Sequence, residues 1–179
     1  DAFGCDINPE YVTKCQRAVA AYPCCTVKVA DFFQSDWPAI LANMSEPILV
    51  VGNPPWVTNA TLGSLGSANL PAKSNLHGHK GLDAITGKSN FDISEWMLLH
   101  FLRLLDGRRA TVAMLCKTVV ARKALQHAWK HNLQIASAEI RRIDATEHFN
   151  ASVDACIFFC EMRPRASTTD CDVYPTLHA

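Results

Sequence analysis

Long hydrophobic runs and an excess of charge of either sign are both absent from the sequence. No apolar stretch approaches the roughly 20 residues that a membrane-spanning helix needs, so we expect no segment to cross a membrane. Lysine and arginine together number 17, as do aspartate and glutamate, which gives a formal net charge of zero. Because nucleic-acid-binding proteins are usually basic, any such binding would need a local positive patch or a segment outside these residues.

Paired Cys-x-x-Cys spacings are also missing, although the chain has 8 cysteines. Cys24 and Cys25 are adjacent, and Cys156 and Cys160 lie in a strand-like run. These spacings do not suit zinc knuckles or a disulfide framework, and no secretion signal is present. We therefore expect reduced, mostly buried thiols, no metal site and a cytoplasmic location.

The sequence has no initiator methionine, signal peptide or transit peptide. It begins at Asp1, inside a stretch up to Ile7 that reads as a β-strand. We therefore expect one folded domain over 1–162 whose N-terminal part is missing. The polar residues 163–179 are expected to form a tail or the start of a further segment.

Apolar runs and helical patterns alternate along the chain. Strands are predicted at 1–7, 25–30, 47–52, 110–116, 133–140 and 153–162, and helices at 9–22, 38–43, 91–105 and 118–131. This alternation is typical of an α/β domain with a mostly parallel sheet. Such a sheet binds ligands outside the carboxyl ends of its strands, which here means just after Ile7, Ala30 and Gly52.

Two of these strand ends carry an acidic residue. Asp6 closes the first strand, where a carboxylate can accept hydrogen bonds from ribose hydroxyls, or can cap the helix that starts near Pro9. Asp31 follows the second strand and, with Phe32 beside it, can hold an adenine amino group next to an aromatic face. The alternative for Asp31 is an ordinary turn residue.

The third strand end carries Asn53-Pro54-Pro55-Trp56, the most specific signal in the sequence. At typical residue usage, Asn-Pro-Pro-aromatic arises by chance in on the order of one in a thousand chains of this length. The alternative is a proline-rich turn with a core tryptophan.

This tetrapeptide suits methyl transfer to an exocyclic amino group. The Asn53 side-chain oxygen and the Pro54 carbonyl can each accept one N–H of the amine, which frees a lone pair otherwise delocalised into the ring. Consecutive prolines fix φ and hold that carbonyl in place. Trp56 offers a flat face for a base taken out of its stack, where stacking contributes about 1–3 kcal/mol.

Val51-Gly-Asn-Pro-Pro-Trp56 resembles the catalytic motif of class I amino-methyltransferases, which use S-adenosylmethionine. The order of the other segments resembles adenine-specific DNA methyltransferases, including those of restriction–modification systems. These segments are Gly4–Pro9, Ala30–Phe32, Gly87–Ile93, His148–Phe149 and Val153–Phe159. The resemblance implies a Rossmann-like, doubly wound, mostly parallel sheet. It also implies that the first strand is missing, because the glycine-rich motif of the family is absent.

The resemblance implies roles for individual residues. Cofactor contacts are implied for Asp6, Ile7, Asp31, Phe32 and Asn53. The catalytic set is Asn53, Pro54, Pro55 and Trp56, and the flipped base would stack on Trp56 and Phe149. Where the family has a small residue or proline after its fifth strand, this chain has Lys117.

The implied reaction is methyl transfer from S-adenosylmethionine to the exocyclic amino group of adenine in double-stranded DNA. The same motif serves methylation of an RNA base or of a protein glutamine, and a degenerate domain kept only for binding is a further alternative. Target recognition by this chain is not expected, because no recognition domain follows Met162.

Two weaker patterns remain. His127 and His131 have a metal-compatible helical spacing but no third ligand, and are predicted to be exposed helix residues. The segment from Trp56 to Asn90 is rich in glycine, serine and asparagine and carries a positive bias. Its basic residues are Lys73, His77, His79, Lys80 and Lys88. They can either contact phosphates or form a solvated loop.

Overall fold

The computed structural model describes residues 1–57 and 92–178. Its strands are β1 (Ala2–Asp6), β2 (Cys25–Val29), β3 (Ile48–Gly52), β4 (Ala110–Lys117), β5 (Ile135–Asp144), β6 (Asp154–Met162) and β7 (Asp172–Tyr174). Its helices are α1 (Pro9–Ala18), α2 (Trp37–Ala42), α5 (Ile93–Leu104), α6 (Thr118–Lys130) and α7 (Ala145–Phe149). The positively biased segment between Trp56 and Asn90 lies almost wholly outside the described residues.

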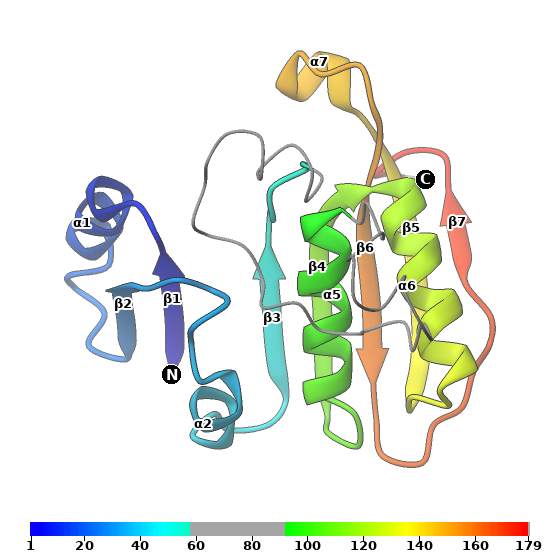
Figure 1. Cartoon of the computed structure of the whole chain (residues 1–179), viewed down its shortest axis with the longest axis horizontal. Coiled ribbons are helices and arrows are strands. Elements are labelled where there is room, and N and C mark those ends of the chain that lie inside the picture. The colour runs from blue at the N-terminus through cyan, green and yellow to red at the C-terminus, as the bar shows by residue number, and fades with distance from the viewer. Residues whose placement is uncertain (58–91, 179) are drawn as a thin grey trace, which may run out of the picture.

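The strands form two sheets, a parallel pair β1–β2 and a five-stranded sheet in the order β3-β4-β6-β5-β7 (Figure 1). The pairs β3–β4 and β5–β7 are parallel, whereas β6 runs antiparallel to both of its neighbours. Three of the five strand pairs among the described residues are therefore parallel. The α/β fold with a mostly parallel, Rossmann-like sheet is confirmed.

A space separates β1 from β3 in Figure 1, and within the described ranges β1 pairs only with β2 and β3 only with β4. Aromatic contacts hold the two sheets together across α2. The Trp37 ring lies 6.1 Å from Phe3 of β1 and 4.9 Å from Phe101 of α5.

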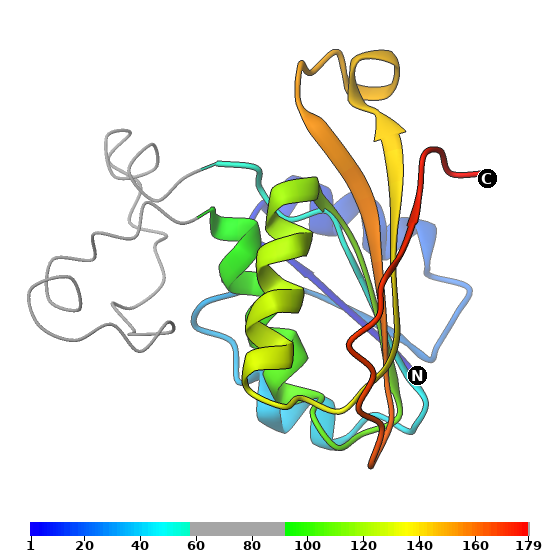
Figure 2. The same cartoon turned by 90° about the vertical axis from the view of Figure 1, so that its right-hand side faces the viewer.

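The main core lies between the five-stranded sheet and the helices α5 and α6, which cover one of its faces (Figure 2). Alternate β4 residues on that face, such as Val112 and Met114, are buried, as the two-residue period of a strand requires. On the opposite face, Leu49 and Val51 of β3 are 66% and 72% exposed. None of the helices in the described ranges has the length and apolar character needed to cross a bilayer.

Two regular elements were not predicted from the sequence. The five-residue helix α7 is too short for a helical period to appear, and it ends at Asn150 in the left-handed conformation. The strand β7 lies in 163–179, which were expected to form a polar tail or the start of a further segment; Asp172–Tyr174 instead form an edge strand of the five-stranded sheet. β7 pairs with β5, and the Arg141 guanidinium lies 4.1 Å from the centre of the Tyr174 ring.

The prediction for the two histidines of α6 is wrong for His127. His127 is only 9% exposed. Its ring stacks on that of His131 with a centroid distance of 4.0 Å, and its Nε2 lies 2.7 Å from Arg103 Nη2. The helical pattern placed both residues on one face, but it did not show that α5 packs against that face.

The prediction for the cysteines holds for the five-stranded sheet but not for the smaller one. Three of the eight thiols, at Cys116, Cys156 and Cys160, are buried, whereas Cys15 and Cys24 are exposed. No group of three or more potential metal ligands occurs within 1–57 and 92–178.

Candidate active site at the carboxyl ends of the strands

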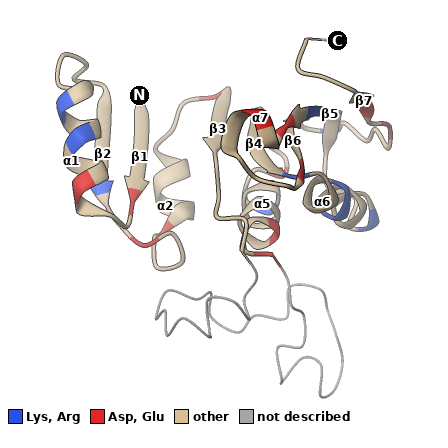
Figure 3. Cartoon of the chain, turned by 90° about the horizontal axis from the view of Figure 1, so that it is seen from above, with Lys and Arg blue, Asp and Glu red and all other residues tan. Residues whose placement is uncertain are grey.

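β1 is parallel to β2, and β3 is parallel to β4. The segments that follow β1 and β3 leave the sheets at the edge where α7 lies (Figure 1). Asp6 ends β1, Asp31 comes two residues after β2, and Asn53 directly follows β3. Seen from above, this edge shows acidic segments at the end of β1 and around the start of α5 (Figure 3). The basic segments lie mainly on α1 and α6.

Asp6 is exposed and does not cap the helix that follows it. Its Oδ1 accepts a hydrogen bond from the backbone N–H of Asn8 at 2.7 Å. The N-cap is Asn8, whose Oδ1 accepts from the backbone N–H of Glu10 at 2.9 Å. The neighbouring Ile7 is 52% exposed, so a carboxylate and an apolar surface lie side by side at this strand end.

Asp31 adopts the turn geometry that was its alternative interpretation. Its Oδ1 accepts from the backbone N–H of Phe33 at 2.8 Å. Asp6 and Asp31 lie at the ends of adjacent parallel strands. The two strand ends are joined by the hydrogen bond from the Ala30 N–H to the Asp6 carbonyl, at 3.0 Å. Asp31 therefore lies beside Asp6 at the carboxyl ends of the strands, even though it forms a turn.

Phe32 lies at the centre of an aromatic cluster made of Phe32, Phe33, Trp37, Trp96, His100 and Phe101. Its ring centroid is 4.9 Å from that of Trp37 and 5.5 Å from that of Phe101. The sequence pattern placed Trp96 on the apolar face of its helix but did not reveal His100, whose ring stacks on that of Trp96 with a centroid distance of 4.8 Å. Burial, and secondarily the charge of Arg103, lowers the pKa of His100, which favours the neutral imidazole.

The segment after β3 presents Asn53 to solvent and buries Pro54. Gly52 precedes it at a close approach, because a Cβ there would lie 3.3 Å from Met114 Sδ of the neighbouring strand. Glycine therefore lets β3 run against β4 up to its last residue, and the strand pairing carries Asn53 to the edge of the sheet.

Trp56 is half-buried and is fixed by two contacts. Its Nε1 donates to the Leu115 carbonyl of β4 at 3.3 Å. Its ring centroid lies 5.8 Å from that of Phe149 on α7, with the planes at 78°. Phe149 is itself 49% exposed. The two aromatic residues assigned to base stacking thus meet in space, and their surfaces remain accessible.

The residue that departs from the family pattern also reaches this edge. Lys117 Nζ forms an ion pair with Asp92 Oδ2 at 2.7 Å. Asp92 is the N-cap of α5 and accepts from the backbone N–H of Ser94 at 3.1 Å. The next residue, Ile93, donates its N–H to the Val57 carbonyl at 3.0 Å. Apart from the unexpected lysine, no pattern in the sequence indicated this pairing.

The strand order, with Asn-Pro-Pro-Trp after β3 and acidic residues at the ends of β1 and β2, defines a domain with the Rossmann-like fold of class I methyltransferases. Over 177 residues, which are 98% of this chain, it is 40% identical to "Type II methyltransferase M.NspV" of Nostoc sp. (strain ATCC 29411 / PCC 7524). The chain is therefore a homologue of a Type II methyltransferase. It spans 37% of the length of that protein.

No protein-family model matches the chain. Among solved structures, the crystal structure of the 23S rRNA methyltransferase ErmE is similar with a TM-score of 0.49 and 15% identity. That alignment covers 93% of this chain and 54% of the other. At these values the likeness adds nothing to what the strand order shows.

Proposed function

We propose that the protein transfers a methyl group from S-adenosylmethionine to the exocyclic amino group of adenine in DNA. The observation that carries this is the position of Asn53-Pro54-Pro55-Trp56 at the carboxyl end of β3, with Trp56 against Phe149. The name of the relative, a Type II methyltransferase, supports a restriction–modification context and hence DNA.

The residues at the ends of β1 and β2 fit the cofactor. Asp6 offers an exposed carboxylate with one oxygen held by the Asn8 amide, which suits hydrogen-bond donors such as ribose hydroxyls. The exposed Ile7 beside it suits a flat apolar ring, and Asp31 with Phe32 would hold the adenine amino group. When bound, S-adenosylmethionine supplies an electrophilic methyl group on a sulfonium.

The Asn53 segment acts on the target amine. The Asn53 side-chain oxygen and the Pro54 carbonyl accept its two N–H groups, so the nitrogen becomes tetrahedral and regains a lone pair. When bound, S-adenosylmethionine would supply the methyl group to this nitrogen, and the amine would afterwards release one proton to solvent. Acceptors fixed in advance are most effective where charge develops in the transition state.

Trp56 and Phe149 would hold the adenine outside the duplex. Their edge-to-face arrangement leaves an exposed aromatic surface on Phe149, and base stacking on such a surface contributes about 1–3 kcal/mol. The Trp56 indole N–H is already bound to the Leu115 carbonyl, so the ring is oriented before any base arrives.

The test is methyl transfer by the full-length protein that contains this domain. Radiolabelled S-adenosylmethionine is offered with duplex DNA, with RNA of the same sequence, and with a glutamine-containing protein, and the labelled product is identified by mass spectrometry. We expect N6-methyladenine in DNA. Label in RNA or in protein would assign the same chemistry to a different acceptor, and no transfer to any acceptor would contradict the proposal.

Asn53→Ala tests the site, and Asn43→Ala is its matched control. Asn43 is an exposed asparagine at the end of α2 whose Nδ2 donates to the Ala39 carbonyl. We expect label transfer to be lost in Asn53→Ala and kept in Asn43→Ala. Equal rates in the two variants would remove Asn53 from the mechanism.

A further inference from the structure

Three contacts link the end of β4, the segment that follows β3 and the start of α5. The Trp56 indole binds the Leu115 carbonyl, the Ile93 N–H binds the Val57 carbonyl, and Lys117 binds Asp92. Gly52 pairs with Met114 in the parallel register, so residues just beyond Met114 lie beside Asn53 and Trp56. The end of β4 thus contacts the Asn-Pro-Pro-Trp segment both before it, at Gly52, and at its last residue, Trp56.

The ion pair is partly removed from water. The Asp92 side chain is 9% exposed and that of Lys117 is 24% exposed. Asp92 Oδ1 accepts from the Ser94 amide and hydroxyl, and Oδ2 accepts from Lys117. Removing one partner of such a pair leaves a buried charge without compensation, which is costly. Without Lys117, the Asp92 carboxylate would keep its hydrogen bonds to Ser94 but would lose the charge that faces its other oxygen.

We propose that Lys117 is a positioning residue of the active site. Its ammonium fixes Asp92, Asp92 fixes the first turn of α5, and the Ile93–Val57 hydrogen bond carries that constraint to the segment bearing Asn53 and Trp56. Lys117 does not touch the reacting atoms, and its role in catalysis rests on the proposed function.

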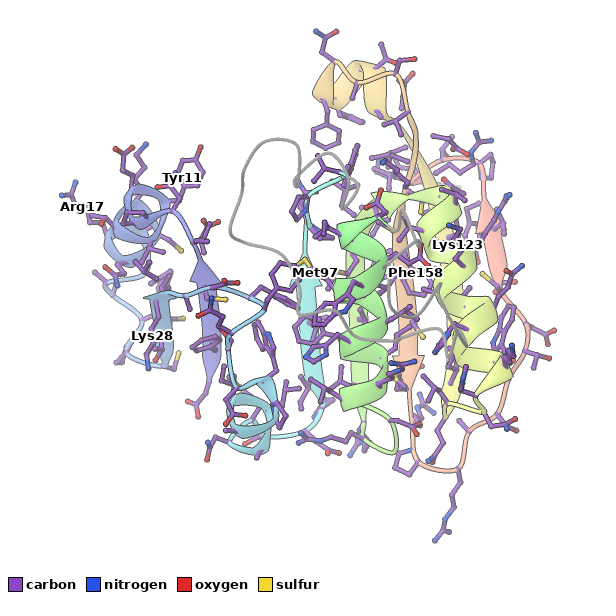
Figure 4. All side chains as sticks on the ribbon, in the orientation of Figure 1. Tyr11, Arg17, Lys28, Met97, Lys123 and Phe158 are labelled. Atoms are coloured by element: carbon purple, nitrogen blue, oxygen red, sulfur yellow. The ribbon has the colours of Figure 1, made fainter. Side chains whose placement is uncertain are left out.

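A second ion pair between a lysine and α5 provides a matched control. Lys123 on α6 (Figure 4) lies 3.4 Å from Glu95 of α5, one turn further along the helix than Asp92. Within 1–57 and 92–178, no hydrogen bond joins Lys123 or Glu95 to Val57. The side chain of Lys123 is 54% exposed and that of Glu95 is 4% exposed. Lys123→Met therefore removes a lysine charge from an ion pair with the same helix α5 and leaves the Lys117–Asp92 pair and the Ile93–Val57 hydrogen bond in place.

The experiment uses the full-length protein with the variants Lys117→Met, Lys117→Arg and Lys123→Met. We expect Lys117→Met to lower kcat by about 10- to 100-fold, because a small displacement of catalytic groups has effects of this size. The KM for S-adenosylmethionine should stay within about twofold, since Asp6 and Asp31 lie on other strands. Lys117→Arg should restore much of the rate. Lys123→Met should keep the wild-type kcat, although it should lower the thermal midpoint because the Glu95 side chain, 4% exposed, loses a charged neighbour.

A readout independent of methyl transfer is hydrogen exchange at the Ile93 amide, which donates to Val57. We expect faster exchange in Lys117→Met and no change in Lys123→Met. Asp92→Asn keeps an acceptor for Ser94 but removes the charge, so it tests the pair from the other side if Lys117→Met folds poorly. The double variant should be no slower than Lys117→Met, because both changes break one interaction.

The outcomes separate this role from the proposed function. A folded, active Lys117→Met variant with wild-type kcat and wild-type Ile93 exchange would refute the role of Lys117 and leave the reaction intact. A lowered thermal midpoint with unchanged kcat would make Lys117 merely structural and would also refute it. If the wild-type protein methylates no acceptor, the proposed function fails, and the catalytic role of Lys117 fails with it.

Discussion

The two sheets of this domain differ in how completely they are packed. The five-stranded sheet buries alternate residues of β4, β5 and β6 against α5 and α6, and Phe158 is fully buried there (Figure 4). In the β1–β2 pair, no strand residue is buried, and α1 buries only Val12. Apolar burial is the main favourable term in folding, so the larger sheet stabilises itself while the smaller one depends on its attachment.

This difference coincides with a division of the candidate site. Asp6, Ile7 and Asp31, which we assign to the cofactor, lie on the loosely packed pair. Asn53 and Trp56, which we assign to the target base, lie on the edge of the well-packed sheet. The target-base side is thus held rigidly by its own core, whereas the cofactor side is held mainly through aromatic contacts such as that of Phe3 with Trp37.

The largest expected effect is on stability. Phe158→Ala removes a fully buried ring from the five-stranded sheet and should lower the free energy of unfolding by about 3–5 kcal/mol. Val12→Ala, in α1, should instead raise the rate of hydrogen exchange mainly within β1, β2 and α1, because Val12 is the buried residue of α1. Denaturant titration and hydrogen exchange measure the two effects. A cooperative loss of the whole structure in Val12→Ala would show that the two sheets unfold as one unit.

The two halves of the site should give opposite kinetic signatures. Asn53→Ala should lower kcat by about 10²–10³ with cofactor affinity nearly unchanged, because it removes one acceptor for the developing charge. Asp6→Ala should weaken binding of S-adenosylmethionine by about tenfold or more, as expected for hydrogen bonds to a charged group. Steady-state kinetics and calorimetric titration test both. Near-wild-type turnover in Asn53→Ala would contradict the assignment of Asn53.

The facing edges of β1 and β3 should limit what residues 1–179 do in isolation. Both edges carry backbone groups that pair with no described strand, and Leu49 and Val51 are exposed beside them. We expect this polypeptide to bind S-adenosylmethionine weakly or not at all and to self-associate. Calorimetry and light scattering check this. Tight stoichiometric binding by a monodisperse sample would show that the β1–β2 pair binds the cofactor without any strand on its open edge.

The smallest effect concerns thiol reactivity, which should follow the same division. Cys15 and Cys24, in the β1–β2 half, are exposed and should be alkylated within minutes at pH 8. Burial raises the pKa of Cys160 to about 12, so its thiol stays protonated at that pH and should not react in the folded protein. Peptide mapping after iodoacetamide treatment measures this. Early labelling of Cys160 would show that the five-stranded sheet opens readily.

Much of the fold could be predicted from local sequence. The apolar run at Ile48–Gly52 and the helical pattern of Ile93–Leu104 match the structure in type and position. The helical period records which side of α5 is buried, whereas the apolar run gave no sign that Leu49 and Val51 are exposed. The helix α7 and the strand β7 were missed because they are too short to show a period. The burial of His127 was missed because it depends on the packing of α5.

The candidate site divides in the same way. The order of the residues along the chain determined that Asp6, Asp31 and Asn53 lie at strand ends, because the carboxyl ends of parallel strands share an edge. Only the tertiary structure decided that Trp56 meets Phe149 and that Lys117 pairs with Asp92. These contacts join residues far apart in sequence, and no local period specifies them. They depend on the register of β4 with β3 and on the direction in which α5 begins.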